Sequence, residues 1–180
     1  LLQSSAASDV YKRQLIYNNK KICDAISSIA DQCNFLLSNE EVTILPVMNG
    51  GLIFSGHLIP KLNCQCVLDY IHATRYLNNR GHQTVNWIYK PKLDLIKGKV
   101  VLVLDDILDE GITLKTIKKN LFEMGAKKVL IAVLFDKKIE KIKPIKADFT
   151  GLEVPNAYVY GFGLDFKGIG RNIPHLYAHK

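Results

Sequence analysis

Three aspartates, and a glycine and a threonine two residues apart, follow the most apolar segment of the chain. Residues 100–104 are Val-Val-Leu-Val-Leu, and residues 105–113 continue as Asp-Asp-Ile-Leu-Asp-Glu-Gly-Ile-Thr. Carboxylates can accept hydrogen bonds from hydroxyl groups or share a divalent cation. A glycine loop that leads into a helix offers unpaired N–H groups and a positive dipole end to a phosphate. The segment therefore predicts a binding site for a sugar phosphate together with Mg²⁺.

A structural explanation exists for each of these acids taken alone. Asp105 and Asp106 could end a strand, and Asp109 could cap a helix, which aspartate does well. Three acids within five residues, followed by Gly-x-Thr, favour a ligand site over this explanation. The segment has neither the Gly-Lys-Ser/Thr of the nucleotide P-loop nor the Gly-x-Gly-x-x-Gly of dinucleotide-binding folds.

Strands and helices alternate around this segment. Apolar residues recur at helical spacing early in the chain, at Ile22, Ile26, Ile29, Cys33 and Leu36. We predict strands at residues 42–48, 66–71, 99–104, 129–135 and 157–160, and further helices at 52–62 and 114–124. This alternation predicts an α/β fold with a mainly parallel β-sheet flanked by helices. The loops at the carboxyl ends of its strands would form the ligand site.

The segment 77–91 is polar and contains glycine, so it predicts either a long loop or an irregular hairpin. A loop of this length in a compact domain is often functional.

The length of 180 residues suits one domain. Residues 1–14 (LLQSSAASDVYKRQ) have no helical or strand period, no initiator Met and no signal-peptide pattern. We therefore expect a non-native or disordered leader at residues 1–14 and a single domain at residues 15–180. No apolar run approaches the roughly 20 residues of a membrane span, so no membrane partner is expected.

The net charge of +7 permits nucleic acid, membrane surfaces or small phosphates as partners and decides little alone. Lysines are densest at residues 137–146, where a solvated surface is the simplest explanation. The histidines have no metal-binding spacing. The cysteines show no zinc pattern either, and we expect reduced thiols in a cytoplasmic protein: Cys23, Cys33, Cys64 and Cys66.

The segment 100–114 resembles the phosphoribosyl pyrophosphate signature of the type I phosphoribosyltransferases: an apolar strand, two acids, two residues, then Asp-x-Gly-x-Thr. Three further segments are similar to the hypoxanthine-guanine branch, in its bacterial form: residues 47–54 (VMNGGLIF), 72–76 (HATRY) and 146–165. The resemblance implies the type I phosphoribosyltransferase fold with a small hood over the active site. It also implies purine salvage, with phosphoribosyl transfer to hypoxanthine or guanine, giving IMP or GMP and pyrophosphate.

The resemblance also implies roles for the residues of the acidic segment. Asp109 matches the catalytic acid that acts on the purine N7 proton. Asp105 and Asp106 match the acids that address the ribose hydroxyls and Mg²⁺. The loop that cradles the 5′-phosphate would run from Asp109 through Glu110, Gly111 and Ile112 to Thr113. Ile112 replaces a basic or polar residue of some relatives, so backbone amides would carry more of the phosphate binding.

On the purine side, Lys137 matches the donor to the 6-oxo group, Tyr158 the stacking ring and Val159 a backbone contact to the base edge. Asp165 matches an acid near a second metal ion, and Arg171 an arginine that grips pyrophosphate. Outside the resemblance, Lys137 could be a solvated lysine, and Tyr158 and Val159 a half-buried strand pair.

The remaining implied sites lie earlier in the chain. Asn49 and Gly50 match the pyrophosphate loop, where relatives often have a cis peptide, here between Met48 and Asn49. Some relatives have Lys in place of Asn49, and without the resemblance this would be an Asn-Gly-Gly turn. Arg75 and Tyr76 begin the segment that closes over the family's active site as a lid.

Two alternatives remain open at this point. One is the same reaction on another base, such as xanthine; adenine is disfavoured because a lysine donor does not suit a 6-amino group. The other is an RNA-binding regulator that kept the fold. The complete set of acids, lysine and aromatic ring favours an enzyme, so nucleic acid is not the expected partner. The expected partners are a purine base, phosphoribosyl pyrophosphate and further copies of the chain, as a homodimer or homotetramer.

Overall fold

The apolar run at residues 100–104 is buried on both faces of a central sheet. The computed structural model describes residues 13–77 and 83–179, and in it this run lies within strand β6 (Val100–Leu108). Val101 and Val103 face one hydrophobic core, whereas the alternate residues of the run face another. Consecutive side chains of a strand point to opposite faces of the sheet, so a strand buried on both faces needs apolar residues at every position.

Most strands of this central sheet are parallel. Besides β6, its strands are β2 (Glu41–Met48), β3 (Gln65–Leu68), β4 (Ile71–Leu77), β5 (Gln83–Tyr89), β7 (Lys128–Lys137) and β8 (Phe149–Val154). Over the described residues the order is β5-β4-β2-β6-β7-β8, and β3 also pairs with β2. Only β4 and β5 pair antiparallel in this sheet, as far as the described residues show. The prediction of a mainly parallel sheet is confirmed.

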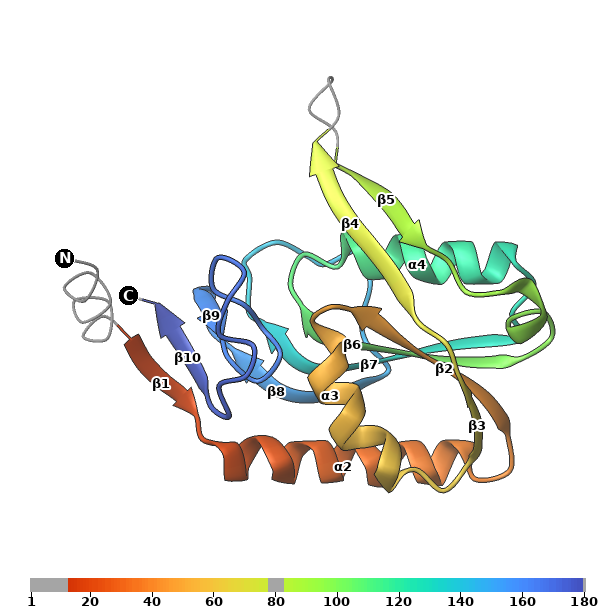
Figure 1. Cartoon of the computed structure of the whole chain (residues 1–180), viewed down its shortest axis with the longest axis horizontal. Helices are drawn as coiled ribbons and strands as arrows, with labels where there is room; N and C mark the ends of the chain where they lie inside the picture. Colours follow the sequence, from red (N-terminus) through yellow and green to blue (C-terminus); the bar gives the residue numbers. More distant parts are fainter. Residues whose placement is uncertain (1–12, 78–82, 180) are drawn as a thin grey trace.

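Helices cover both faces of the sheet (Figure 1). Helices α2 (Asn19–Leu37) and α3 (Gly51–Leu58) pack on one face, and a 3-10 turn, Ile59–Lys61, follows α3. Helix α4 (Ile112–Glu123) packs on the other face, and a 3-10 turn at Leu93–Leu95 precedes β6. The predicted alternation of helices and strands is therefore confirmed.

A second, smaller sheet is built from both ends of the described chain. It is antiparallel, in the order β1-β10-β9, with β1 at Arg13–Tyr17, β9 at Tyr158–Tyr160 and β10 at Leu176–His179. The strand expected at 157–160 thus exists, but it belongs to this sheet and not to the central one. Arg13 and Gln14 pair with β10, so the fold includes two residues that we had assigned to the leader. Residues 1–12 of that leader lie outside the described residues.

Three other elements refine the sequence-based expectations. Leu37 is 1% exposed and completes the buried face of α2, whereas Leu36 is 44% exposed. The strand predicted at 66–71 is two strands, β3 and β4. The polar segment 77–91 contains β5, which pairs antiparallel with β4 as the hairpin alternative requires; residues 78–82 lie outside the described residues.

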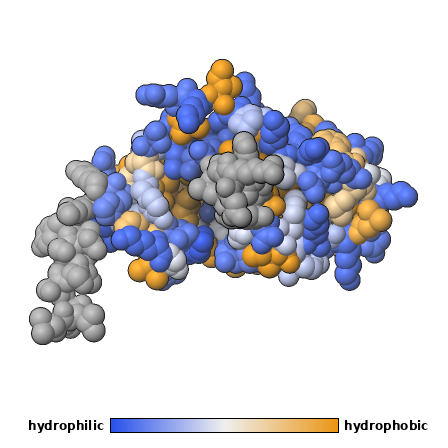
Figure 2. Space-filling model, turned by 90° about the horizontal axis from the view of Figure 1, so that it is seen from above, coloured by the Kyte–Doolittle hydropathy of each residue, from blue (hydrophilic) through white to orange (hydrophobic). Residues whose placement is uncertain are grey.

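Exposed apolar side chains are spread over several elements, and Figure 2 shows them as separate patches on a mainly hydrophilic face. Scattered exposed apolar residues are normal for a folded domain. Among the described residues, no helix is both long and apolar enough to cross a membrane.

Candidate active site

The acidic segment lies at the carboxyl end of β6. The strand continues through Asp105 and Asp106 and ends at Leu108, because its last residues pair with β7 in register Leu108↔Asp136. The expectation that the strand ends at the acids is therefore wrong by a few residues. The acids lie inside the ladder, where the backbone fixes their direction.

A cavity of about 470 Å³ opens at this edge of the sheet. Of the predicted site residues, it is lined by Asn49, Gly50, Asp105, Asp106, Asp109, Glu110, Gly111, Thr113, Lys137, Tyr158, Val159, Asp165 and Arg171. Ile112 begins α4 and does not line it. The backbones of Arg75 and Tyr76 lie in β4, but their side chains fall outside the described part of the chain. The fold thus gathers residues from across the sequence into one site.

Gly111 forms the turn from the loop into α4. Its φ is 80°, in the left-handed region that favours glycine, and a Cβ there would lie 3.0 Å from Ile145 Cγ2. The N-cap residue of this helix is Gly111 itself, which has no side chain to bind the first backbone amides. The first backbone amides of α4 and the Thr113 hydroxyl can therefore serve a phosphate.

The loop that follows β2, at Asn49 and Gly50, lies next to Asp106. The peptide between Met48 and Asn49 is cis, as the resemblance implied. At Gly50, a Cβ would lie 2.0 Å from Asp106 Oδ2, so no side chain fits at this position. The backbone of residues 49–50 therefore lies directly against the Asp106 carboxylate.

Asp106 is a buried acid, with 8% of its surface exposed. Burial raises the pKa of its carboxyl group. A side-chain hydrogen bond with Asp105, backbone hydrogen bonds and the charge of Arg171 oppose that rise. Its neighbour Asp105 accepts a hydrogen bond of 3.0 Å from the Asp106 amide. A buried carboxylate of this kind is suited to a bound cation.

The acids do not form a closed metal site by themselves. Within the described residues, no group of three or more His, Cys, Asp or Glu side chains is placed to hold a metal ion. Asp165 accepts hydrogen bonds from Arg171 (2.6 Å) and from the Gly168 amide (2.8 Å). Magnesium is commonly held by one or two carboxylates together with substrate phosphates and water. The donor set fits that mode of binding.

The small sheet, together with residues 161–175 between β9 and β10, is the hood; it contributes Arg171 and the ring of Tyr158 to the site. Arg171 also donates to the Gly163 carbonyl at 2.6 Å, and a Cβ at Gly163 would lie 2.8 Å from the Gly50 carbonyl oxygen. The hood therefore packs closely on the loop that bears Gly50. Tyr158 is 52% exposed, with Phe166 packed edge-on against its ring at 5.3 Å, so the ring has area left for a ligand.

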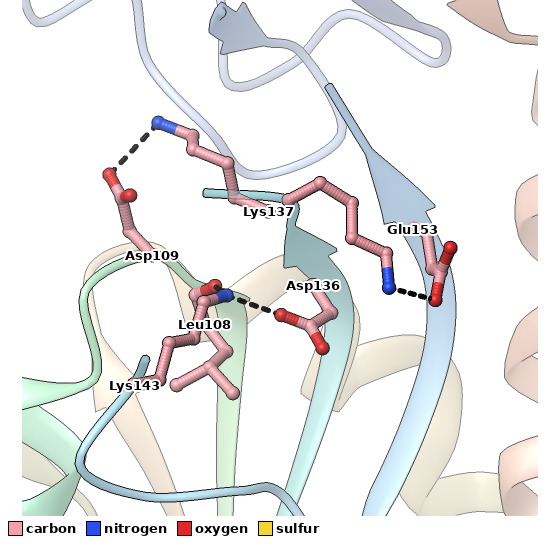
Figure 3. A network of polar contacts seen from close by, with 7 residues as sticks. Leu108, Asp109, Asp136, Lys137, Lys143 and Glu153 are labelled. Atoms are coloured by element: carbon pink, nitrogen blue, oxygen red, sulfur yellow. Dashed lines mark hydrogen bonds and ion pairs between the residues drawn. The ribbon is translucent and has the colours of Figure 1, made fainter. Parts of the chain in front are cut away.

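Asp109 and Lys137, which both line the cavity, form an ion pair. Lys137 Nζ lies 2.9 Å from Asp109 Oδ2, with the lysine side chain 14% and the aspartate 35% exposed (Figure 3). They follow β6 and end β7, respectively, next to the paired residues Leu108 and Asp136. A donor and an acceptor are thus held side by side at the mouth of the site.

Lys143 lies next to the cavity-lining residue Leu108, and the sequence did not predict this contact. It belongs to the lysine-rich run that we assigned to a solvated surface, yet its side chain is only 13% exposed and pairs with Asp136. The spacing of lysines gave no signal, because the contact depends on how the chain turns after β7.

Comparisons with known proteins agree with this geometry. The family model described as "Phosphoribosyl transferase domain" matches residues 13–167. A hypoxanthine-guanine phosphoribosyltransferase of Aquifex aeolicus is 31% identical, covering 92% of this chain and 94% of the relative. One from Streptococcus pneumoniae is 27% identical, covering 91% of each chain. A solved hypoxanthine phosphoribosyltransferase of Staphylococcus aureus, 22% identical, superposes with a TM-score of 0.83 over 100% of this chain and 97% of that one.

The burial of Asp106 predicts that Asp106→Asn stabilises the protein without ligands at pH 7. Because the pKa of Asp106 is raised in the folded state, the group does not lower the free energy of unfolding below its unfolded pKa of about 4. As the pH rises from there towards the folded pKa, the free energy of unfolding falls. The gain should therefore shrink towards pH 4. For a chain of this size, 1 kcal/mol corresponds to about 2–4 °C in Tm. Thermal unfolding of both proteins across this range checks it; a lower Tm for the variant at pH 7 would contradict it.

Proposed function

This chain belongs to the phosphoribosyl transferase family, and we propose that it transfers the 5-phosphoribosyl group from phosphoribosyl pyrophosphate to hypoxanthine or guanine. The products are IMP or GMP and pyrophosphate, and the reaction salvages free purine bases. Relatives that bear the name hypoxanthine-guanine phosphoribosyltransferase and match along most of this chain support this assignment.

The Asp109–Lys137 pair is the observation that favours a 6-oxopurine over adenine as the substrate base. In a 6-oxopurine, the oxygen on C6 lies next to N7, so the base presents an acceptor beside a ring nitrogen that can carry a proton. The Lys137 ammonium can donate only, and the Asp109 carboxylate can accept only. Held 2.9 Å apart, they complement these two positions. Adenine offers an amino donor where Lys137 needs an acceptor.

The phosphoribosyl group would occupy the edge formed by β6 and α4. The amides of residues 110–113 and the Thr113 hydroxyl bind the 5′-phosphate, and Asp105 and Asp106 accept from the ribose hydroxyls. The backbone of Asn49 and Gly50, with Arg171, faces the pyrophosphate, whose oxygens suit a guanidinium fork. Asp105, Asp106 and Asp165 would hold Mg²⁺ directly or through water, and when bound it neutralises charge on the pyrophosphate.

The reaction is a displacement at the anomeric carbon of the sugar. The bond from this carbon to the pyrophosphate oxygen breaks, and a bond to the purine nitrogen forms. Asp109 takes the proton that the purine loses, while Lys137 stabilises charge on the 6-oxo group. Tyr158 stacks on the base and Val159 offers backbone groups to its edge. Holding both substrates in place supplies much of the acceleration.

Three further features belong to this proposal. The β4–β5 hairpin, whose base contributes Ala73 to the cavity wall, acts as the lid over the reacting centre and carries Arg75 and Tyr76. The protein assembles as a homodimer or homotetramer. It works in the cytoplasm, which suits the four cysteines, all free of disulfides.

Pyrophosphate release tests the proposed function directly. With phosphoribosyl pyrophosphate and Mg²⁺, we expect release with hypoxanthine or guanine, much less with adenine, and none once a chelator removes the metal ion. Release with adenine alone would overturn the assignment of the base. Undiminished turnover in excess chelator would overturn the role of Mg²⁺.

Lys137→Met should weaken discrimination between hypoxanthine and adenine. The variant keeps much of the side-chain stem but loses the donor, and a buried hydrogen-bond partner left unsatisfied costs about 1–3 kcal/mol. The ratio of kcat/KM for the two bases should therefore fall by about 5- to 150-fold, the same free energy expressed as a rate ratio. The adjacent Lys138, which pairs with Glu153 and has a 61% exposed side chain, offers the control Lys138→Met. An unchanged ratio in Lys137→Met would reject the assignment.

Asp109→Asn should slow the chemical step while leaving the binding of phosphoribosyl pyrophosphate largely intact. Asparagine keeps the size of the side chain but cannot take the purine proton, and losing a general base costs about 10²–10⁴ in rate. Single-turnover rates measure the first effect, and equilibrium binding of phosphoribosyl pyrophosphate measures the second. If Asp109 only shaped the loop before α4, an asparagine of the same size would serve equally well and the rate would stay near the wild-type value.

A further inference from the structure

A single ammonium group ties together the two strand ends that carry Asp109 and Lys137. Lys143 Nζ donates to the backbone carbonyl of Leu108 at 2.6 Å and also pairs with the Asp136 carboxylate. Figure 3 shows the Lys143 side chain extending from the chain that follows β7 to Leu108 and Asp136, where the pairing of β6 with β7 ends.

The two partners of Lys143 are the chain neighbours of the proposed base-binding pair. Leu108 precedes Asp109, Asp136 precedes Lys137, and Leu108↔Asp136 is the last register pair between β6 and β7. Beyond this pair, the ladder between these strands no longer fixes the chain. Lys143 therefore binds both strands at the point where Asp109 leaves the sheet.

Pro144 and Ile145, the two residues after Lys143, pack next to Gly111 in the 109–113 loop. At Gly111, the nearest atoms to a Cβ would be Ile145 Cγ2 at 3.0 Å, Leu108 Cδ1 at 3.3 Å and Pro144 Cδ at 3.6 Å. Ile145 also packs against the core on the α4 side of the sheet. Pro144 and Ile145 thus lie against Gly111 of the 109–113 loop, while Lys143 holds Leu108, the residue just before that loop.

Because Lys143 and its partner are largely shielded from water, the loss of one of their charges should destabilise the protein. Its side chain is 13% exposed, and that of Asp136 is 28% exposed. Removing one member of such a pair leaves the other as a partly buried, uncompensated charge, whereas neutralising both avoids that cost. The hydrogen bond to Leu108 is a separate contribution, which only a donor at position 143 can supply.

We propose that Lys143 is a positioning residue, which sets the spacing and direction of the Asp109–Lys137 pair and of the 109–113 loop. This inference rests on the proposed function, because the pair is there assigned to the purine. Lys143 touches neither substrate in this arrangement. It acts by holding the Leu108 carbonyl and Asp136, and a displacement of about 1 Å at a reacting group can cost on the order of 10² in rate.

The test compares Lys143→Met, the double variant Lys143→Met/Asp136→Asn and the control Lys141→Met, an exposed lysine of the same run. For each, kcat and KM with hypoxanthine and the Tm are measured. Lys143→Met should lower kcat about 10- to 100-fold and lower Tm, and Lys141→Met should change neither. The double variant should recover Tm, because no charge is left unpaired, yet keep the low kcat, because the Leu108 carbonyl still lacks its donor. Recovery of kcat together with Tm would overturn the proposal.

A second readout does not depend on the reaction. Amide hydrogen exchange across residues 109–113 should be faster in Lys143→Met and in the double variant than in wild type or Lys141→Met. Equal exchange in all four proteins would overturn the positioning role even where the variants are less active. A wild-type protein that turns over no purine would overturn the proposed function, and the exchange rates would still decide whether Lys143 holds the loop.

Discussion

The parallel pairing of β6 with β7 is the constraint on which the site depends. Its register ends at Leu108 opposite Asp136, so the next residues along the two strands, Asp109 and Lys137, emerge side by side. Backbone hydrogen bonds between buried strands are among the most reliable means of fixing a spacing. The same strand directs Asp105 and Asp106 into the cavity, and the loop after it leads directly into α4. One ladder therefore aligns the groups proposed for the base, the ribose and the phosphate.

Several charged side chains of the site are buried or nearly buried, where apolar side chains would ordinarily be expected. Asp106 is buried against Gly50, whose missing side chain makes room for it, and Lys137 and Lys143 are both largely covered. Burying ionised groups is unfavourable unless they are paired or neutralised. Lys143 and Lys137 have carboxylate partners within the chain, whereas burial still raises the pKa of Asp106. Because burial outweighs the charge of Arg171 and the hydrogen bonds at Asp106, a cationic partner is proposed for the Asp106 side of the cavity.

Local sequence patterns predicted most elements that position the site. The features that they did not predict, which are β8, the small sheet and the Lys143 contact, depend on contacts between residues far apart in the sequence. The apolar run at 100–104 indicated a doubly buried strand, and the acids after it indicated a ligand site. β8 was missed because Gly151 weakens its strand pattern; in the fold, a Cβ there would lie 2.5 Å from the Leu134 carbonyl oxygen, so close approach requires glycine. The small sheet was missed because β1 and β10 come from opposite ends of the described chain. The contact of Lys143 with Leu108 likewise joins residues with no shared local pattern.

The most direct test of this account is a crystal structure of the protein bound to IMP. We expect Lys137 Nζ within about 3 Å of the 6-oxo group. Asp109, carrying the proton that it takes from the purine, should donate to N7 over a similar distance, and both are hydrogen-bond distances. The ring of Tyr158 should stack on the base, and the phosphate should lie at the start of α4. A nucleotide bound with its base away from both side chains, and with the Lys137–Asp109 ion pair still closed, would contradict the account.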